Sequence, residues 1–195
     1  MTDAELVSQI SNGNPNAFRF LVSNNQQLVL HIAGRIIRRQ DELEDICQEV
    51  FIKVYRKLKS FRGDSRLSTW IATIAYNTSI SYLRKQSRYD EVLYDNEIPA
   101  AFEKTGSEFA SGEVEKNEVR QYLLELIEEL PVHYRSVLTL FYLEEFSYKE
   151  IEQITGMPEG TIKSYLSRAR GLLKGKIEKQ TETDKTNIFA EYAGK

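Results

Sequence analysis

Apolar residues recur every three or four positions in two separate stretches of this chain, and the spacing disappears between them. The first stretch covers about residues 3–86 and the second about residues 114–177. Such spacing is typical of amphipathic helices that share a buried face. Residues 87–112 lack it and contain proline, glycine and many acids. The sequence therefore predicts an all-α fold of two small helical domains joined by a flexible acidic linker. The expected bounds are 1–88 for the first domain, 89–113 for the linker, 114–178 for the second domain and 179–195 for a tail.

Capping residues and helix breakers indicate where the helices begin and end. Asn14 and Pro15 form a helix start, and Ser147 can cap a short helix that Gly156 ends. The last helix is expected to end near Ile177, before a frayed polar tail. The expected helices cover residues 3–10, 15–38, 41–59, 66–86, 114–130, 132–144, 148–155 and 158–177. The side chains expected to point inward from 132–144 are Tyr134, Val137, Leu138, Phe141 and Tyr142.

The distribution of charge along the chain is more informative about binding partners than the formal net charge of −3. Residues 53–88 hold nine cations against Asp64 alone, and residues 158–176 hold five against Glu159 alone. Between them, residues 90–129 hold twelve acids against three cations. Two basic blocks therefore flank one acidic block. Each block could be an ordinary solvated face, but both basic blocks coincide with motifs of a DNA-binding kind.

Several classes of protein are disfavoured by composition. Cys47 is the single cysteine and excludes an internal disulfide; its apolar neighbours at helical spacing indicate a core position. His31 and His133 stand far apart with no cysteine cluster, so no metal site is expected. No catalytic group and no cofactor are expected either. No apolar run approaches the roughly 20 residues that cross a bilayer. Since the acidic start also lacks the features of a signal peptide, we expect a cytoplasmic protein without membrane insertion.

Residues 147–170 have the spacing of a helix-turn-helix motif. A short helix ends at Gly156, which suits the positive φ of a tight turn, and Pro158 begins the second helix. Ile151, Ile154 and Leu166 belong to the apolar stripe that holds the two helices together. The opposite face carries hydroxyls and long cations, a set that suits the major groove of DNA. A helical hairpin with a solvated face is the alternative. This predicted recognition face comprises Gly160, Thr161, Lys163, Ser164, Ser167, Arg168 and Arg170.

The helix at 41–59 carries two stripes. Ile46, Val50, Val54 and Leu58 form the core stripe, with Cys47, Phe51 and Tyr55 beside them. An apolar Ile52 among acids on the outer face suggests a surface for docking another protein, although a solvated face is the plainer alternative. The predicted docking surface comprises Asp45, Gln48, Glu49 and Ile52.

The loop at 61–65 and the helix after it suggest contact with unstacked bases. Trp70 is interpreted as a core residue beneath the loop. An aromatic and an amide beside cations can hold bases taken from the stack. The residues expected to share the outer face of this helix are Thr69, Thr73, Tyr76, Asn77, Ile80 and Arg84.

Asp45–Phe51, the Phe61–Ser65 loop and the Leu67–Lys85 helix resemble region two of sigma-70 family factors, and Pro131–Lys176 resembles region four. The absence of a substantial domain between them resembles the extracytoplasmic function (ECF) subfamily. The resemblance implies a sigma factor that binds core RNA polymerase, recognises the minus-35 and minus-10 promoter elements and promotes DNA melting. It also implies an anti-sigma factor as partner. The docking surface would bind core polymerase and the recognition face would read the minus-35 element. The implied minus-10 contacts, called the strand surface below, are Phe61, Arg62, Gly63, Asp64, Ser65, Tyr76, Asn77, Arg84, Lys85 and Arg88.

The sequence leaves two alternative functions open. One is a stand-alone helix-turn-helix regulator that binds duplex promoter DNA without polymerase. The other is an enzyme, which is disfavoured because no nucleophile–base pair, phosphate-binding glycine loop or metal cluster stands out in the sequence.

Overall fold

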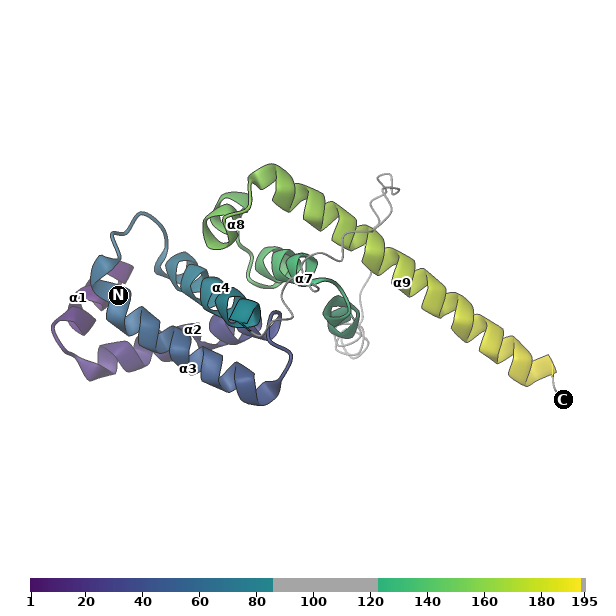
Figure 1. The fold of residues 1–195 in the computed structure, drawn as a ribbon, viewed down its shortest axis with the longest axis horizontal. Helices are drawn as coiled ribbons and strands as arrows, with labels where there is room; N and C mark the ends of the chain where they lie inside the picture. Colours follow the sequence, from purple (N-terminus) through teal and green to yellow (C-terminus); the bar gives the residue numbers. More distant parts are fainter. Residues whose placement is uncertain (86–122, 194–195) are drawn as a thin grey trace.

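The computed structural model describes the backbone of residues 1–85 and 123–193 and the side chains of 1–85 and 123–178 (Figure 1). Within these ranges the regular structure is helical and contains no strand. This agrees with the expected all-α fold of two helical domains. The expected linker and Arg88 lie outside the described residues.

The described N-terminal domain is a bundle of four α-helices, of which the first two have side-chain caps at their starts. Thr2 and Glu5 form a capping box at the first helix, and Asn14 accepts hydrogen bonds from Asn16 N and Ala17 N at the second. These caps satisfy amide groups that a helix start leaves without partners. The elements are α1 (Asp3–Ser11), α2 (Pro15–Gly34), α3 (Gln40–Lys57), the 3-10 turn η1 (Leu58–Ser60) and α4 (Leu67–Lys85).

The C-terminal domain contains the helix-turn-helix that the sequence predicts. Ser147 caps α8 (Tyr148–Thr155) in a capping box with Glu150, and Gly156 ends it at φ 72°. A helix at residues 123–128 precedes α7 (Val132–Leu138), the π-helix η2 (Thr139–Leu143), α8 and α9 (Glu159–Ala193).

The π-helix makes one expectation wrong. Tyr142 was expected to point inward, but it is 51% exposed. Glu144 N donates to Thr139 O, five residues back, so this turn holds one residue more than an α-helical turn. Tyr142 is thereby rotated out of the apolar stripe that an α-helical period predicts.

The last helix is also longer than expected. We expected it to end near Ile177, but α9 continues to Ala193. Residues 178–193 contain no glycine or proline that would stop it. Figure 1 shows the C-terminal half of α9 projecting away from the rest of the molecule.

Helix α4 lies between the two domains. It packs against α2 and α3 on one side and against α8 on the other, as Figure 1 also shows. Buried apolar side chains of both domains form one continuous core. Its fully buried members include Leu21, Val50, Ile71, Val137, Ile151 and Ile162.

Polar contacts join α2 to the C-terminal domain. His31 Nδ1 lies 2.5 Å from Glu144 Oε1, and Arg35 pairs with Glu128. Arg135 is only 1% exposed and donates to the Glu128 backbone oxygen at 3.0 Å. Burial, and then the nearby charge of Arg38 and Arg35, lowers the pKa of Arg135 to about 10. Arg135 therefore stays charged at neutral pH, with Glu128 as its carboxylate partner.

The carboxylate of Glu150 on α8 binds Arg66, just before α4, and Thr69, within α4. Glu150 Oε1 accepts from Arg66 Nη2 at 2.5 Å, Arg66 Nε at 2.8 Å and Thr69 Oγ1 at 3.0 Å. Its Oε2 accepts from Ser147 N at 3.0 Å and Ser147 Oγ at 2.7 Å. Desolvation raises the pKa of Glu150, but the hydrogen bonds from Ser147, Arg66 and Thr69 outweigh it and hold the pKa at about 2. The carboxylate thus stays ionised in all but strong acid.

Gly156→Ala should lower the free energy of unfolding by about 1 kcal/mol, because an L side chain is strained at this positive φ. Gly175→Ala is the control, since a Cβ there meets no atom within 4 Å and the residue is helical. This second change should stabilise the protein by about 0.5 kcal/mol. Chemical denaturation checks both, and equal effects would contradict the role of Gly156.

Glu150→Gln should destabilise the folded protein at neutral pH, and the difference from wild type should shrink in acid. A pKa lowered from 4.5 to about 2 gives stabilisation that is complete above about pH 4.5 and is lost as the pH falls toward 2. Denaturation midpoints at pH 7, 4 and 3 measure this trend. Glu152→Gln, an exposed change on the same helix, is the control. A difference that stays constant with pH would contradict the assignment.

Candidate nucleic-acid interface

The recognition face lies along the first turns of α9, directly after the tight turn at Gly156. Thr161 and Ser164 are half-buried at its edge. The other members are exposed, namely Gly160, Lys163, Ser167, Arg168 and Arg170. The structure therefore brings together the seven residues that the sequence singled out.

Lys163 is held in place before any ligand binds. Its Nζ lies 2.6 Å from Glu159 Oε1 and 5.1 Å from the ring centroid of Tyr148. The hydrogen bond with Glu159, and then its negative charge, raises the pKa of Lys163. Sequence reasoning missed the contact with Tyr148, because the two residues belong to different helices.

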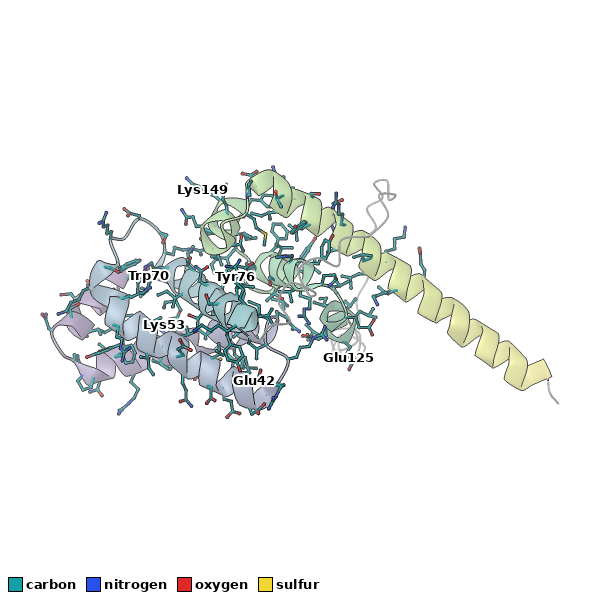
Figure 2. All side chains as sticks on the ribbon, viewed as in Figure 1. Glu42, Lys53, Trp70, Tyr76, Glu125 and Lys149 are labelled. Carbon is teal, nitrogen blue, oxygen red and sulfur yellow. The ribbon has the colours of Figure 1, made fainter. Side chains whose placement is uncertain are left out.

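Two aromatic side chains pack together beneath the loop of the strand surface. Phe61 packs edge-on against Trp70, with ring centroids 5.6 Å apart and planes at 62°. Gly63 adopts φ 79°, which turns the loop sharply between the exposed Arg62 and Asp64. Trp70 lies near the start of α4 and is half-buried, in agreement with its interpretation as a support beneath the loop (Figure 2).

The outer face expected for α4 is only partly exposed. Thr69, Tyr76 and Ile80 were expected to face outward, but they are 1%, 5% and 6% exposed. The expectation is wrong for them because α4 packs between the two domains. Asn77 and the C-terminal Arg84 and Lys85 are exposed as expected. The strand surface therefore consists of an exposed loop and one face of α4. Tyr76 belongs to that face but is buried in this structure.

The docking surface is fully exposed on α3, on the side away from the core. Asp45, Gln48 and Glu49 are exposed, and Ile52 is 50% exposed. Glu49 pairs with Lys53 at 2.6 Å along the same helix. An exposed branched aliphatic side chain among carboxylates suits a protein partner with basic and apolar groups.

A shallow apolar groove adjoins the docking surface, and sequence reasoning did not find it. Tyr55 was assigned to the edge of the core, but it is 56% exposed and packs edge-on against Phe18 of α2 at 4.9 Å. The periodicity of α3 alone gave no signal of this pair, which depends on the crossing of two helices. The groove is lined by Phe18, Phe51, Ile52, Tyr55 and Arg56.

Neither a metal cluster nor a membrane span is found in the described part of the chain. Residues 1–85 and 123–178 contain no group of three or more His, Cys, Asp or Glu side chains placed to hold a metal ion. None of the described helices is long and apolar enough to cross a bilayer. Cys47 is half-buried against the core, and burial, then the charge of Glu44, raises the pKa of its thiol.

Comparison with known proteins agrees with this geometry. Residues 21–89 match the family model described as Sigma-70 region 2, and residues 120–173 match the model described as Sigma-70, region 4. The first match covers the loop and α4, and the second covers the helix-turn-helix.

Two curated relatives match almost the whole chain. The chain is 33% identical to the ECF RNA polymerase sigma-E factor of Haemophilus influenzae over 183 residues, which cover 91% of this chain and 96% of the relative. It is 38% identical to the factor of the same name from Escherichia coli K12, covering 91% of this chain and 95% of the relative.

A solved structure shares the fold across both domains. It is the sigma factor RpoE from Bartonella quintana in complex with the anti-sigma factor NepR, with a TM-score of 0.61 and 26% identity. The match covers 83% of this chain and 96% of that chain. Both regions are therefore present, in the order and with the fold of full-length relatives, and the chain belongs to the ECF subfamily of sigma-70 family RNA polymerase sigma factors.

Proposed function

We propose that the chain binds core RNA polymerase through the docking surface, reads the minus-35 element with the recognition face and promotes minus-10 melting with the strand surface. The observation that carries this proposal is the placement of two cationic, polar surfaces on separate domains, each in a segment that matches its family region. Hydroxyls and cations of α9 suit the major groove. The aromatic-backed loop before α4 suits a flipped base.

No catalytic role is proposed for any residue, and no cofactor is needed for this function. Sigma factors act by positioning polymerase, so the protein itself would work without enzymatic chemistry in the cytoplasm. A further partner follows from the Bartonella relative, which is bound to an anti-sigma factor. We propose an anti-sigma factor that covers the two basic surfaces of this chain. The stand-alone regulator is not favoured, since both family regions are present.

A pull-down with purified core polymerase, followed by run-off transcription, tests the proposed function. Mapping transcription start sites after overexpression first supplies the promoter for the run-off template. The full chain should bind core polymerase and direct transcription from that promoter. Tight binding to promoter duplex combined with failure to bind core polymerase would favour a stand-alone regulator instead.

Asp45→Lys combined with Ile52→Lys should weaken binding to core polymerase by about tenfold or more, because both changes bury a new cation at the contact. Fluorescence anisotropy with labelled protein measures the affinity. Glu152→Lys is the control, since it makes a charge change at an exposed position outside the docking surface. Intact polymerase binding by the double variant would contradict the docking assignment.

Lys163→Ala combined with Arg168→Ala should weaken binding of the holoenzyme to the upstream element by about tenfold or more, because two phosphate or base contacts are lost. Footprinting of the upstream element measures this effect. Lys174→Ala, which removes an exposed cation farther along α9, is the control. Wild-type protection by the double variant would exclude the recognition face from promoter contact.

A further inference from the structure

The ammonium group of Lys163 lies beside the start of the neighbouring helix α8. Its Nζ is 5.1 Å from the ring centroid of Tyr148, which is the first residue of α8. Glu159, one turn earlier on α9, holds the same nitrogen at 2.6 Å. A cation within about 6 Å of an aromatic centroid is attracted to the face of the ring. The two contacts therefore direct this cation of the recognition face toward α8.

The ring of Tyr148 is fixed by the C-terminal domain. Phe141 stacks against it, with ring centroids 5.1 Å apart and planes at 18°. Both rings are half-buried and pack against the buried core. The ring therefore has a set position from which it holds the Lys163 ammonium group.

Arg168 differs from Lys163 in its surroundings. Its side chain is exposed, and no ion pair or ring contact joins it to another residue in 1–85 or 123–178. In a helix-turn-helix complex, the second helix lies in the major groove and the first helix crosses the sugar-phosphate backbone. By that geometry the start of α8 lies over phosphates, and the exposed face of α9 lies over base edges. Lys163 is thus directed toward the backbone, while Arg168 is free to reach a base.

The chemistry of the two cations agrees with this division. A lysine binds phosphate as a point charge, whereas the planar fork of an arginine matches the paired acceptors of a guanine. Lys149, the second residue of α8, is exposed and adds another cation to the same end of this helix (Figure 2). The start of α8 therefore suits a phosphate group.

We propose that Tyr148 is a positioning residue that assigns Lys163 to a backbone phosphate of the minus-35 element. Base readout is then left to Ser164, Ser167 and Arg168. This inference rests on the proposed function of the recognition face, which it divides into a phosphate-binding part and a base-reading part. When DNA binds, the phosphate replaces the carboxylate of Glu159 as the anion beside Lys163, while the aromatic contact keeps the ammonium group in place.

A scan of neutral linkages tests the phosphate assignment. Holoenzyme is assembled from core polymerase and the full chain, and its affinity is measured for promoter fragments that each carry one methylphosphonate within the upstream element. Neutralising the phosphate beside α8 should weaken wild-type binding about fivefold or more, and Lys163→Ala should abolish this difference. Lys174→Ala, which removes an exposed cation farther along α9, should retain it. If no linkage distinguishes Lys163→Ala from wild type, the phosphate assignment is wrong.

Single base-pair changes in the same element test the division of the recognition face. Lys163→Ala should weaken binding to every sequence by a similar factor. Arg168→Ala should instead reduce the discrimination at one base pair by about fivefold or more. A loss of discrimination in Lys163→Ala would overturn the inference, because it would show that Lys163 reads a base.

Two substitutions test the role of Tyr148. Tyr148→Leu removes the aromatic face and should weaken promoter binding a few-fold, whereas Tyr148→Phe keeps the face and should bind like wild type. Adding Lys163→Ala to Tyr148→Leu should cost less affinity than Lys163→Ala costs the wild type, since the two residues act together. Additive losses would contradict the positioning role. Unchanged circular dichroism and polymerase affinity of Tyr148→Leu show that its loss does not come from unfolding.

The outcomes separate this inference from the proposed function. If the wild-type holoenzyme does not distinguish the matched upstream element from altered ones, the proposed function of the recognition face is wrong. If it does distinguish them, but the methylphosphonate and base-pair scans give the same pattern for Lys163→Ala and Arg168→Ala, only the division of that face is wrong.

Discussion

The burial of α4 on two sides is the constraint on which the rest of the structure depends. One side completes the N-terminal bundle with α2 and α3, and the other receives α8 of the helix-turn-helix. The buried residues of α4 include the small or hydrogen-bonded Thr69, Ala72, Ala75 and Ser79. Ser79 donates back to Ala75 O at 2.9 Å, so its hydroxyl is satisfied without a partner from another helix.

Local chemistry allowed much of the fold to be predicted from the sequence. The cap at Asn14, the capping box at Ser147 and the left-handed Gly156 each act within a few residues, and the structure has all three. Contacts between domains left no such local signal. Tyr76 was expected to face outward because nothing near it in sequence reveals its burial, and Tyr142 was misplaced because a π-helix changes the period. Of the candidate site, the exposure of the docking surface and of most of the recognition face could therefore be predicted, while the burial of Thr69, Tyr76 and Ile80 on α4 could not.

Charge is arranged between the domains as well as on the outer surfaces. The C-terminal domain turns three acids, Glu128, Glu144 and Glu150, toward Arg35, His31 and Arg66 of the N-terminal domain. Buried Arg135 shares Glu128 with Arg35. Some basic groups of this chain, which has a slight net negative charge, are thus partly neutralised by acids of the chain itself. Ion pairs at a domain boundary become weaker as the salt concentration rises, if their groups are exposed to solvent.

The contact of Lys163 with Glu159 and Tyr148 has a consequence for the thermodynamics of DNA binding. A free lysine loses up to about 2 kcal/mol of rotamer entropy when it is fixed. Lys163 has already lost part of that freedom, and on meeting a phosphate it exchanges one anion for another. If the recognition face binds DNA as proposed, the dependence of promoter affinity on ionic strength should be shallower than the number of cations on α9 suggests, because the carboxylate of Glu159 that Lys163 leaves attracts a cation itself and lowers the net release of counterions.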